Sequence, residues 1–296
     1  MSPGRQRLAL EKAFVPANID GNVVTFTGPN FDGPAVPARC YGGNTVAQIC
    51  NAVRALYQPL VVNTVKVNFS APGGVDVPSD YVVEGYPDSD VLNIKGYQKG
   101  RLFVLGKATV CDSSDLLSIT VNPMPKVPPP LDNPSLQFCM ATTADPSPWN
   151  VFKVLLKVNW FEVRPVDFNR IVTQICSNES QFYWARISED FRDTEDMDRI
   201  DGFTVIMFLS DYLIGCPGLV HRALHGAHTQ FDGGASLTHN VTFHTHLIDE
   251  KSWFLCETFS ETQGCNRYLL YARIYAEDGR LVATVVQEAY SPSSKI

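Results

Sequence analysis

A proline-rich stretch, Pro123-Met-Pro-Lys-Val-Pro-Pro-Pro130, divides the chain. Three consecutive prolines cannot continue a helix or a central strand, because proline lacks the backbone N–H and has a fixed φ. Such a stretch favours an extended linker. We therefore predict two folded halves, the first over residues 8–122 and the second over 137–292, joined by a linker over 123–136.

The first half predicts one helix followed by antiparallel strands. Residues 44–57 carry apolar side chains at helical spacing on one stripe, and Gly42-Gly43 before them lets the backbone turn tightly into a helix. Alternating apolar and polar residues over 60–69 are typical of a half-buried strand. Further strands are predicted over 81–84, 91–98 and 101–110, with a hairpin turn at Gln98-Lys-Gly-Arg101.

The second half repeats this order loosely. A helical segment is predicted near residues 211–225, although Pro217 and two glycines weaken the pattern, and the acidic stretch 188–202 before it is predicted to be a solvated loop. Asp278-Gly279 predicts a hairpin between the last two strands. The predicted strands cover 161–165, 182–186, 236–247, 252–260, 267–275 and 280–290. One helix with about four antiparallel strands, occurring twice, suggests two sheets that are each wrapped around a helix.

Composition excludes several classes of protein. Hydrophobic residues make up 45% of the 296-residue chain and charged residues only 19%, so a sizeable core is expected and disorder is not. The net charge is −7 and no basic run occurs, which argues against nucleic acid as a partner. No apolar run reaches 18 residues, so no membrane span is expected. A soluble enzyme fits these values, and a homo-oligomer is compatible with them.

The ends of the chain and its cysteines bear on location. None of the eight cysteines forms a CxxC pair, and the first residues lack the apolar core of a secretory signal, so reduced intracellular thiols are expected. The sequence ends in Ser294-Lys295-Ile296, a one-residue variant of the Ser-Lys-Leu peroxisomal address. We therefore expect a peroxisomal protein, delivered by the import receptor that reads such a tripeptide, or else a cytoplasmic one.

Two polar residues in the second half are candidates for a site, each with a structural alternative. Gln287 shares strand phase with Leu281, Ala283 and Val285, so its amide is expected to be buried and must find a partner, catalytic or structural. Asp211 precedes an apolar run, where it would serve as a helix N-cap, as a catalytic carboxylate, or as both.

The histidines and one cysteine raise rival readings. All six histidines lie between residues 221 and 246, and His221 and His225 have the i, i+4 spacing of a zinc site. No Cys pair or HExxH motif accompanies them, so we expect no metal. Cys216 lies near Asp211 and His221, but no local signature marks it as an activated nucleophile, and a buried inert thiol is expected.

Several short segments, distributed in order over nearly the whole chain, match the motifs of one known family. They are Leu10-Glu-Lys12, Tyr41-Gly-Gly43, Phe161-Glu-Val-Arg-Pro165, Ser210-Asp211, Ala235-Ser-Leu-Thr-His239, Phe243-His244, Asp278-Gly-Arg-Leu-Val-Ala283 and Val286-Gln-Glu288. In these segments the chain resembles the TesB-like (type II) acyl-CoA thioesterases. The resemblance implies an α+β double hot-dog fold, two fused hot-dog domains whose antiparallel sheets each wrap around a central helix. The first domain would span 8–122, and the second, with the catalytic residues, 137–292.

The resemblance also implies the chemistry. The family's catalytic Asp, Thr or Ser, and Gln fall on Asp211, Ser236 and Gln287, which would activate one water to hydrolyse an acyl-CoA or related acyl thioester. A thioester is electrophilic, so a carboxylate that accepts the water's proton suffices without a covalent nucleophile. No metal or redox cofactor is implied. Without the resemblance, Ser236 would be an ordinary serine at the start of a strand.

Some positions depart from the family pattern. Thr238 stands where the family usually has Asp, Thr245 stands where it often has Arg, and Tyr86-Pro-Asp-Ser-Asp90 replaces a basic turn. These departures suggest a specialised member, such as one serving a biosynthetic pathway, in which Thr238→Asp would raise a slow activity on straight-chain acyl-CoAs. Two alternatives stay open: an acyltransferase or off-loading enzyme, and a non-catalytic protein that binds acyl thioesters.

Overall fold

The computed structural model describes most of the chain, in segments separated by gaps. The described residues are 10, 12–33, 36–116, 123–142, 159–168, 180–192, 197, 199–212, 214, 234–264 and 266–290. The first strands are β1 (Asn18–Asp20), β2 (Val23–Phe26), β3 (Asp32–Gly33), β4 (Val36–Cys40), β5 (Val61–Phe69), β6 (Ser79–Gly85), β7 (Val91–Gln98) and β8 (Arg101–Cys111). The later strands are β9 (Phe161–Pro165), β10 (Gln181–Ile187), β11 (Ala235–Phe243), β12 (Phe254–Gly264), β13 (Arg267–Ala276) and β14 (Leu281–Tyr290). The helices are α2 (Gly42–Tyr57), α3 (Leu136–Thr142), α6 (Glu189–Arg192) and α7 (Gly202–Ser210), with single 3-10 turns at Ser113–Asp115 and Pro130–Asp132.

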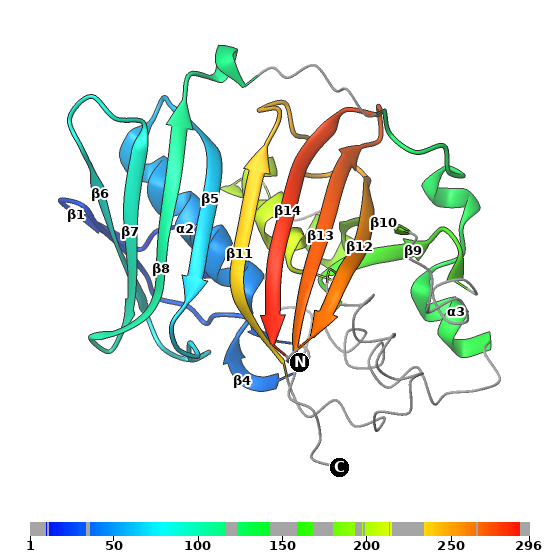
Figure 1. The fold of residues 1–296 in the computed structure, drawn as a ribbon, viewed down its shortest axis with the longest axis horizontal. Helices are drawn as coiled ribbons and strands as arrows, with labels where there is room; N and C mark the ends of the chain where they lie inside the picture. Colours follow the sequence, from blue (N-terminus) through cyan, green and yellow to red (C-terminus); the bar gives the residue numbers. More distant parts are fainter. Residues whose placement is uncertain are drawn as a thin grey trace.

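Twelve of the strands in the described segments join into one antiparallel sheet. Their order is β1-β2-β6-β7-β8-β5-β11-β14-β13-β12-β10-β9, and β3 and β4 form a separate pair. The strands of the first half and of the second half meet where β5 pairs with β11, with Val65 opposite Val241. The expected double hot-dog α+β fold is confirmed, and its two sheets are joined edge to edge through this pair (Figure 1). The domain boundaries at 122 and 137 stay a prediction.

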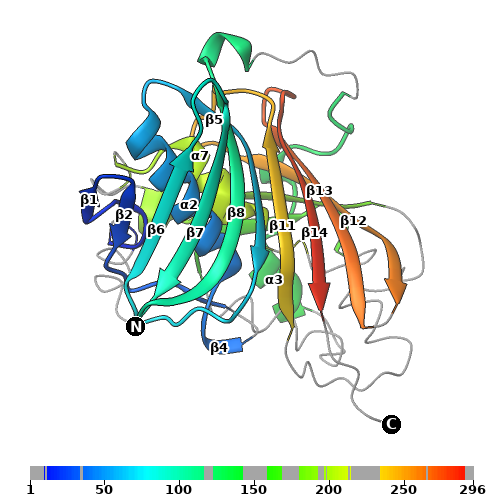
Figure 2. The same ribbon diagram turned by 60° about the vertical axis from the view of Figure 1, so that its left-hand side comes forward.

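Helices α2 and α7 lie side by side against one face of this sheet (Figures 1 and 2). The hydroxyl of Tyr41, just before α2, donates to the carbonyl of Phe208 in α7 at 3.1 Å. At the other end of the pair, Thr204 Oγ1 donates to Asn51 Oδ1 at 2.9 Å. The two helices therefore hold each other in register, and this fixes the start of α2 beside the end of α7.

The predicted first helix and most of the predicted strands are confirmed. α2 begins two residues earlier than the apolar stripe indicated, and β7 alternates buried and half-buried residues along its whole length. The hairpin at residues 98–101 places Lys99 and Gly100 at φ 51° and 73°, and Gly279 at φ 91° makes the last hairpin turn. The left-handed conformations of Lys99 and Gly100 are the ones that a two-residue hairpin requires, and Gly279 supplies the left-handed residue of a longer hairpin loop.

The helix predicted over residues 211–225 is wrong at its start. α7 ends at Ser210, and the residues beyond 214 in that range lie outside the described segments. Periodicity missed α7 because all nine of its residues are buried, so it carries no polar face to produce a 3.6-residue pattern. The predicted acidic loop is also wrong in part, since Glu189–Arg192 is the short helix α6 and Phe191 in it is buried.

The proline-rich linker covers the face of the sheet opposite the two helices. Leu255 alternates with Phe254 and Cys256 along β12 and packs in an outer cluster with Trp184, Trp253 and Tyr275, against Met124 and Val127 of the linker. Trp184 Nε1 donates to the carbonyl of Pro128 at 2.9 Å. The extended prolines leave their carbonyls free to accept such bonds.

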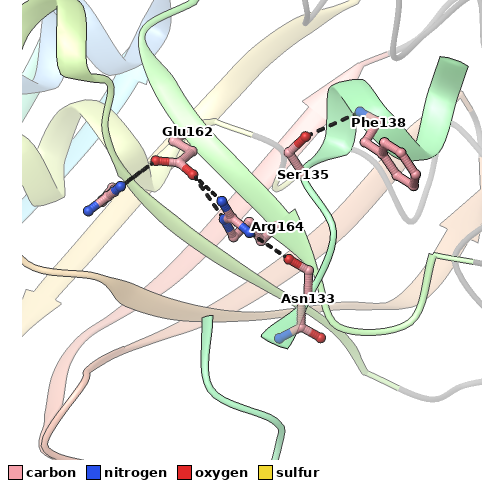
Figure 3. A network of polar contacts seen from close by, with 6 residues as sticks. Asn133, Ser135, Phe138, Glu162 and Arg164 are labelled. Atoms are coloured by element: carbon pink, nitrogen blue, oxygen red, sulfur yellow. Dashed lines mark hydrogen bonds and ion pairs between the residues drawn. The ribbon is translucent and has the colours of Figure 1, made fainter. Parts of the chain in front are cut away.

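Polar contacts fasten the end of the linker to β9. Arg164 Nη1 donates to the carbonyl of Asn133 at 2.7 Å, and Arg164 also pairs with Glu162 (Figure 3). Two residues later, Ser135 Oγ accepts from the backbone N–H of Phe138 at 3.2 Å and caps α3. Among the helices of the described segments, none is long and apolar enough to cross a membrane.

Candidate active site

Asp211 lies directly after the last residue of α7. It is the C-cap of that helix, so the expectation that it caps the N-terminus of a following helix is wrong. Its backbone N–H donates to the carbonyl of Leu209. Its side-chain carboxylate points away from α7. The side chain is directed to the start of α2, where the sheet halves meet.

The three residues that the sequence predicted for the site come together. Ser236 Oγ donates to Asp211 Oδ1 at 3.3 Å, and Gln287 Nε2 donates to the same oxygen at 2.9 Å. Gln287 Nε2 also lies 2.5 Å from Ser236 Oγ. Asp211, Ser236 and Gln287 come from the end of α7, from β11 and from β14, so three separate elements converge on one carboxylate.

The N-terminus of α2 supplies the third contact to this carboxylate. The backbone N–H of Gly43 donates to Asp211 Oδ2 at 3.0 Å. The first N–H groups of a helix have no acceptor within the helix and carry its positive dipole end, so an anion is stabilised there. The close approach depends on Gly42, because a Cβ on that residue would lie 2.6 Å from Asp211 Oδ2.

Burial sets the acidity of the base. Removal from water raises the pKa of Asp211, and the hydrogen bonds from Gln287, Gly43 and Ser236 offset part of this rise. The carboxylate is therefore a stronger base than a solvated aspartate, while its hydrogen bonds hold it in one orientation. Such a group can take a proton from a water placed beside Ser236 and Gln287.

Gln287 is buried, as its strand phase predicted. It is 3% exposed and shares the inner face with Ala283 and Val285. Leu281 does not share that face, contrary to expectation, because the register of β13 and β14 shifts between Ile274 and Tyr275. Leu281 instead packs against the outer cluster beneath the linker.

His239 belongs to the same network, and the sequence did not predict a role for it. It pairs with Gln287 across β11 and β14 and is only 1% exposed. Its Nδ1 lies 3.1 Å from Gln287 Oε1, and its Nε2 lies 2.8 Å from Ser210 Oγ. A signal was present in the sequence, since His239 stands in phase with the apolar Val241 and Phe243, and a buried imidazole needs partners.

Thr238 lies beside the site but is bonded to the backbone. Its hydroxyl accepts from the N–H of Glu288 at 3.2 Å, where the register of β11 and β14 shifts between Ser236 and Thr238. The family's aspartate could accept the same bond at this position. The threonine therefore provides an acceptor for the Glu288 N–H at the place where the register of the two strands shifts.

From the structure, we expect Thr238→Asp to change kcat by less than about threefold, since the aspartate can accept the same bond from the Glu288 N–H that the threonine accepts. The resemblance predicts instead that the substitution raises the activity. Steady-state kinetics of both forms on one acyl-CoA decide between the two predictions. A rise of tenfold or more would contradict the structural one.

We expect Gly42→Ala to lower kcat by about tenfold to a hundredfold, because the added methyl group displaces the Asp211 carboxylate and small misplacements are costly in catalysis. The fold should survive, since the group it meets is the end of a side chain. Gly43→Ala is the matched comparison: its Cβ would lie 2.6 Å from the backbone carbonyl oxygen of Phe208, which cannot move easily. Gly43→Ala should therefore lower the melting temperature more than Gly42→Ala does, and the reverse order would contradict this account.

The rival metal and cysteine readings gain no support from the described residues. No group of three His, Cys, Asp or Glu side chains within those segments could hold a metal ion. His244 Nε2 lies 3.1 Å from Thr284 Oγ1, an ordinary cross-strand contact. His221, His225 and Cys216, on which those readings depended, lie outside the described residues.

Comparisons with known proteins identify the family. The family model described as "Acyl-CoA thioesterase C-terminal domain" matches residues 138–291, which include all three predicted site residues. Human acyl-coenzyme A thioesterase 8 is 26% identical over 269 residues, covering 86% of this chain and 81% of the human protein.

Solved structures share the fold. Acyl-CoA thioesterase II TesB2 from Mycobacterium marinum superposes with a TM-score of 0.71 at 20% identity, covering 97% of this chain and 99% of that one. A hot-dog protein of unknown function from Alicyclobacillus acidocaldarius superposes with a TM-score of 0.69 at 18% identity, covering 97% and 99%. The family model covers more than half of the chain, and we conclude that this protein belongs to the TesB-like acyl-CoA thioesterase family of hydrolases.

Proposed function

We propose that this protein hydrolyses an acyl-CoA, or a related acyl thioester, to a free acid and a thiol, with Asp211 as the general base. The observation that carries the proposal is the meeting of Ser236 Oγ and Gln287 Nε2 on one oxygen of the Asp211 carboxylate. A hydroxyl and an amide beside a buried carboxylate are what is needed to hold a water and accept its proton.

The reaction follows from the properties of these groups. A water held by Ser236 and Gln287 attacks the acyl carbonyl carbon while Asp211 takes its proton. A C–O bond forms between the water oxygen and the acyl carbon, and the C–S bond breaks. The sulfur leaves as a thiolate, and the acyl group is released as a carboxylic acid. The Gly43 N–H in the first turn of α2 already donates to Asp211, and the positive end of the helix dipole at this place favours negative charge near the site.

The proposal is tested with a panel of acyl-CoAs and acyl-pantetheines assayed for thiol release, with Asp211→Asn as the control. Release of thiol with equal free acid supports hydrolysis. Formation of an ester or amide when an alcohol or amine is added would identify an acyltransferase. Tight binding of acyl-CoA by both forms, with no release from any thioester, would leave a binding protein.

The finer expectations stay predictions. The departures from the family pattern at Thr238, Thr245 and Tyr86–Asp90 predict slow cleavage of common straight-chain acyl-CoAs and a narrower substrate, as in a biosynthetic pathway. The panel above measures this directly. Ser294-Lys295-Ile296 lies outside the described residues, so peroxisomal import remains a prediction, as does homo-oligomer formation.

The pH dependence of kcat/KM should report the Asp211 carboxylate. Only the ionised form can act as a base, and burial raises its pKa. Activity should therefore fall as the pH falls through a midpoint above the ordinary aspartate value of about 3.9. A profile of kcat/KM between pH 4 and 8 measures this midpoint. A midpoint at or below about 4 would contradict a desolvated base.

A further inference from the structure

The orientation of the Gln287 amide decides whether the site works. The two ends of an amide side chain have nearly the same shape, but one end donates and the other accepts. Here Nε2 faces Asp211 Oδ1 and Ser236 Oγ, while Oε1 faces away toward His239. The reversed amide would set its carbonyl oxygen against the carboxylate, and it would lose the two bonds that it donates to Asp211 and Ser236, the groups proposed to hold and deprotonate the water.

The imidazole of His239 lies on the far side of this amide. His239 is opposite Gln287 in the β11–β14 ladder, and both side chains are almost completely buried. Its Nδ1 is 3.1 Å from Gln287 Oε1. On the other edge of the ring, Nε2 is 2.8 Å from the hydroxyl of Ser210, the residue that precedes Asp211. The ring thus bridges the end of α7 and the strand that carries Gln287.

The proton positions on this ring follow from its partners. An amide oxygen only accepts, so Nδ1 must carry a hydrogen for the contact with Gln287 to be a hydrogen bond. Burial lowers the pKa of His239, so the ring is neutral near pH 7 and Nε2 holds a lone pair. Ser210 then donates to Nε2, with the carbonyl of Met207, also 2.8 Å away, as the competing acceptor for its proton.

We propose that His239 is a positioning residue, whose Nδ1–H holds the Gln287 amide with its NH₂ group toward Asp211 and Ser236. The inference rests on the proposed function, since it concerns the same water. His239 touches neither the carboxylate nor the attacking water in this scheme and acts only through Gln287. Ser210 supports it by favouring the ring tautomer that has its hydrogen on Nδ1.

The test compares two substitutions of opposite character. His239→Asn keeps an N–H that can take the place of Nδ1–H, whereas His239→Leu is apolar and close in size. His239→Leu should lower kcat by about tenfold to a hundredfold, the cost of a misplaced group, with KM changed by less than about threefold. His239→Asn should recover most of that loss.

The melting temperatures should follow the opposite order. A buried leucine needs no hydrogen bond, while a buried asparagine needs several, so the leucine variant should be the more stable of the two. A purely structural histidine would make activity follow stability, with leucine ahead of asparagine, and that result would overturn the proposal. If the leucine variant does not fold, His239→Ala takes its place in the same comparison.

A double-substitution experiment tests whether His239 acts through Gln287. In the Gln287→Ala background, His239→Leu should cause no further loss of kcat, because there is no amide left to orient. Equal losses in both backgrounds would overturn the proposal. Failure of the proposed function gives a different result from failure of this inference, because Asp211→Asn would then keep its turnover. If Asp211→Asn is inactive and His239→Leu is fully active, only the role of His239 is wrong.

Discussion

Replacing Asp211 with asparagine is expected to lower kcat by about 10²–10⁴-fold, the range typical of a lost general base. Asparagine keeps the size of the side chain and one accepting oxygen, which can still take the bonds from Ser236 and Gln287, but it cannot accept a proton. The bonds from Ser236, Gln287 and Gly43 all converge on this carboxylate, so no other group in the described network is placed to take over its role.

The measurement is the rate of thiol release with one acyl-CoA at saturating concentration, together with a thermal unfolding curve. The melting temperature should change little, since the shape of the side chain is retained. Turnover like that of the wild type in Asp211→Asn would remove Asp211 from the mechanism. If Asp211→Asn loses both activity and folded protein, Asp211→Glu serves as the second test. This variant keeps the carboxylate and should retain more activity than the asparagine variant.

Replacing Gln287 with alanine is expected to lower kcat by about 10²–10³-fold while raising KM much less, because its donors serve the transition state more than the bound substrate. The amide acts by holding Asp211 and Ser236, to which it donates, in the arrangement that positions the water. Truncation also leaves the Nδ1–H of His239 without its acceptor, which should cost about 1–3 kcal/mol of folding stability.

Separate measurements of kcat, KM and the melting temperature distinguish the possible roles of Gln287. An effect confined to KM would make it a substrate-binding residue. A large loss of stability with normal specific activity in the remaining folded protein would make it structural. Gln287→Glu provides a further comparison, because a second carboxylate beside Asp211 would repel it and raise its pKa.

The local elements were predictable wherever burial alternates with exposure. The sequence of α2 carries an apolar stripe at helical spacing, and β7 alternates buried and half-buried residues, so residue spacing alone located them. α7 was not predictable in this way because its residues are buried on every side. A pattern of polar and apolar residues shows which side of an element faces water, and α7 has no side that faces water.

The candidate site was predicted in part. The buried phase of Gln287 along β14 follows from the sequence and is confirmed. The selection of Asp211 and Ser236 depended on the resemblance to a family, since an aspartate after an apolar helix and a serine at the start of a strand are common features. The role of His239 required the structure, because its partners Ser210 and Gln287 lie 29 and 48 residues away along the chain.

The sequence by itself determined the two halves, the helix–strand order in the first of them, most strand positions and the need for a partner at Gln287. These follow from local spacing, from proline chemistry and from the cost of burying an unpaired amide. The tertiary structure decided the pairing of β5 with β11, the place of Gly43 beside Asp211, and the direction in which the Gln287 amide faces. Such contacts join residues far apart in the chain, and their geometry depends on how whole elements pack, which no local pattern specifies.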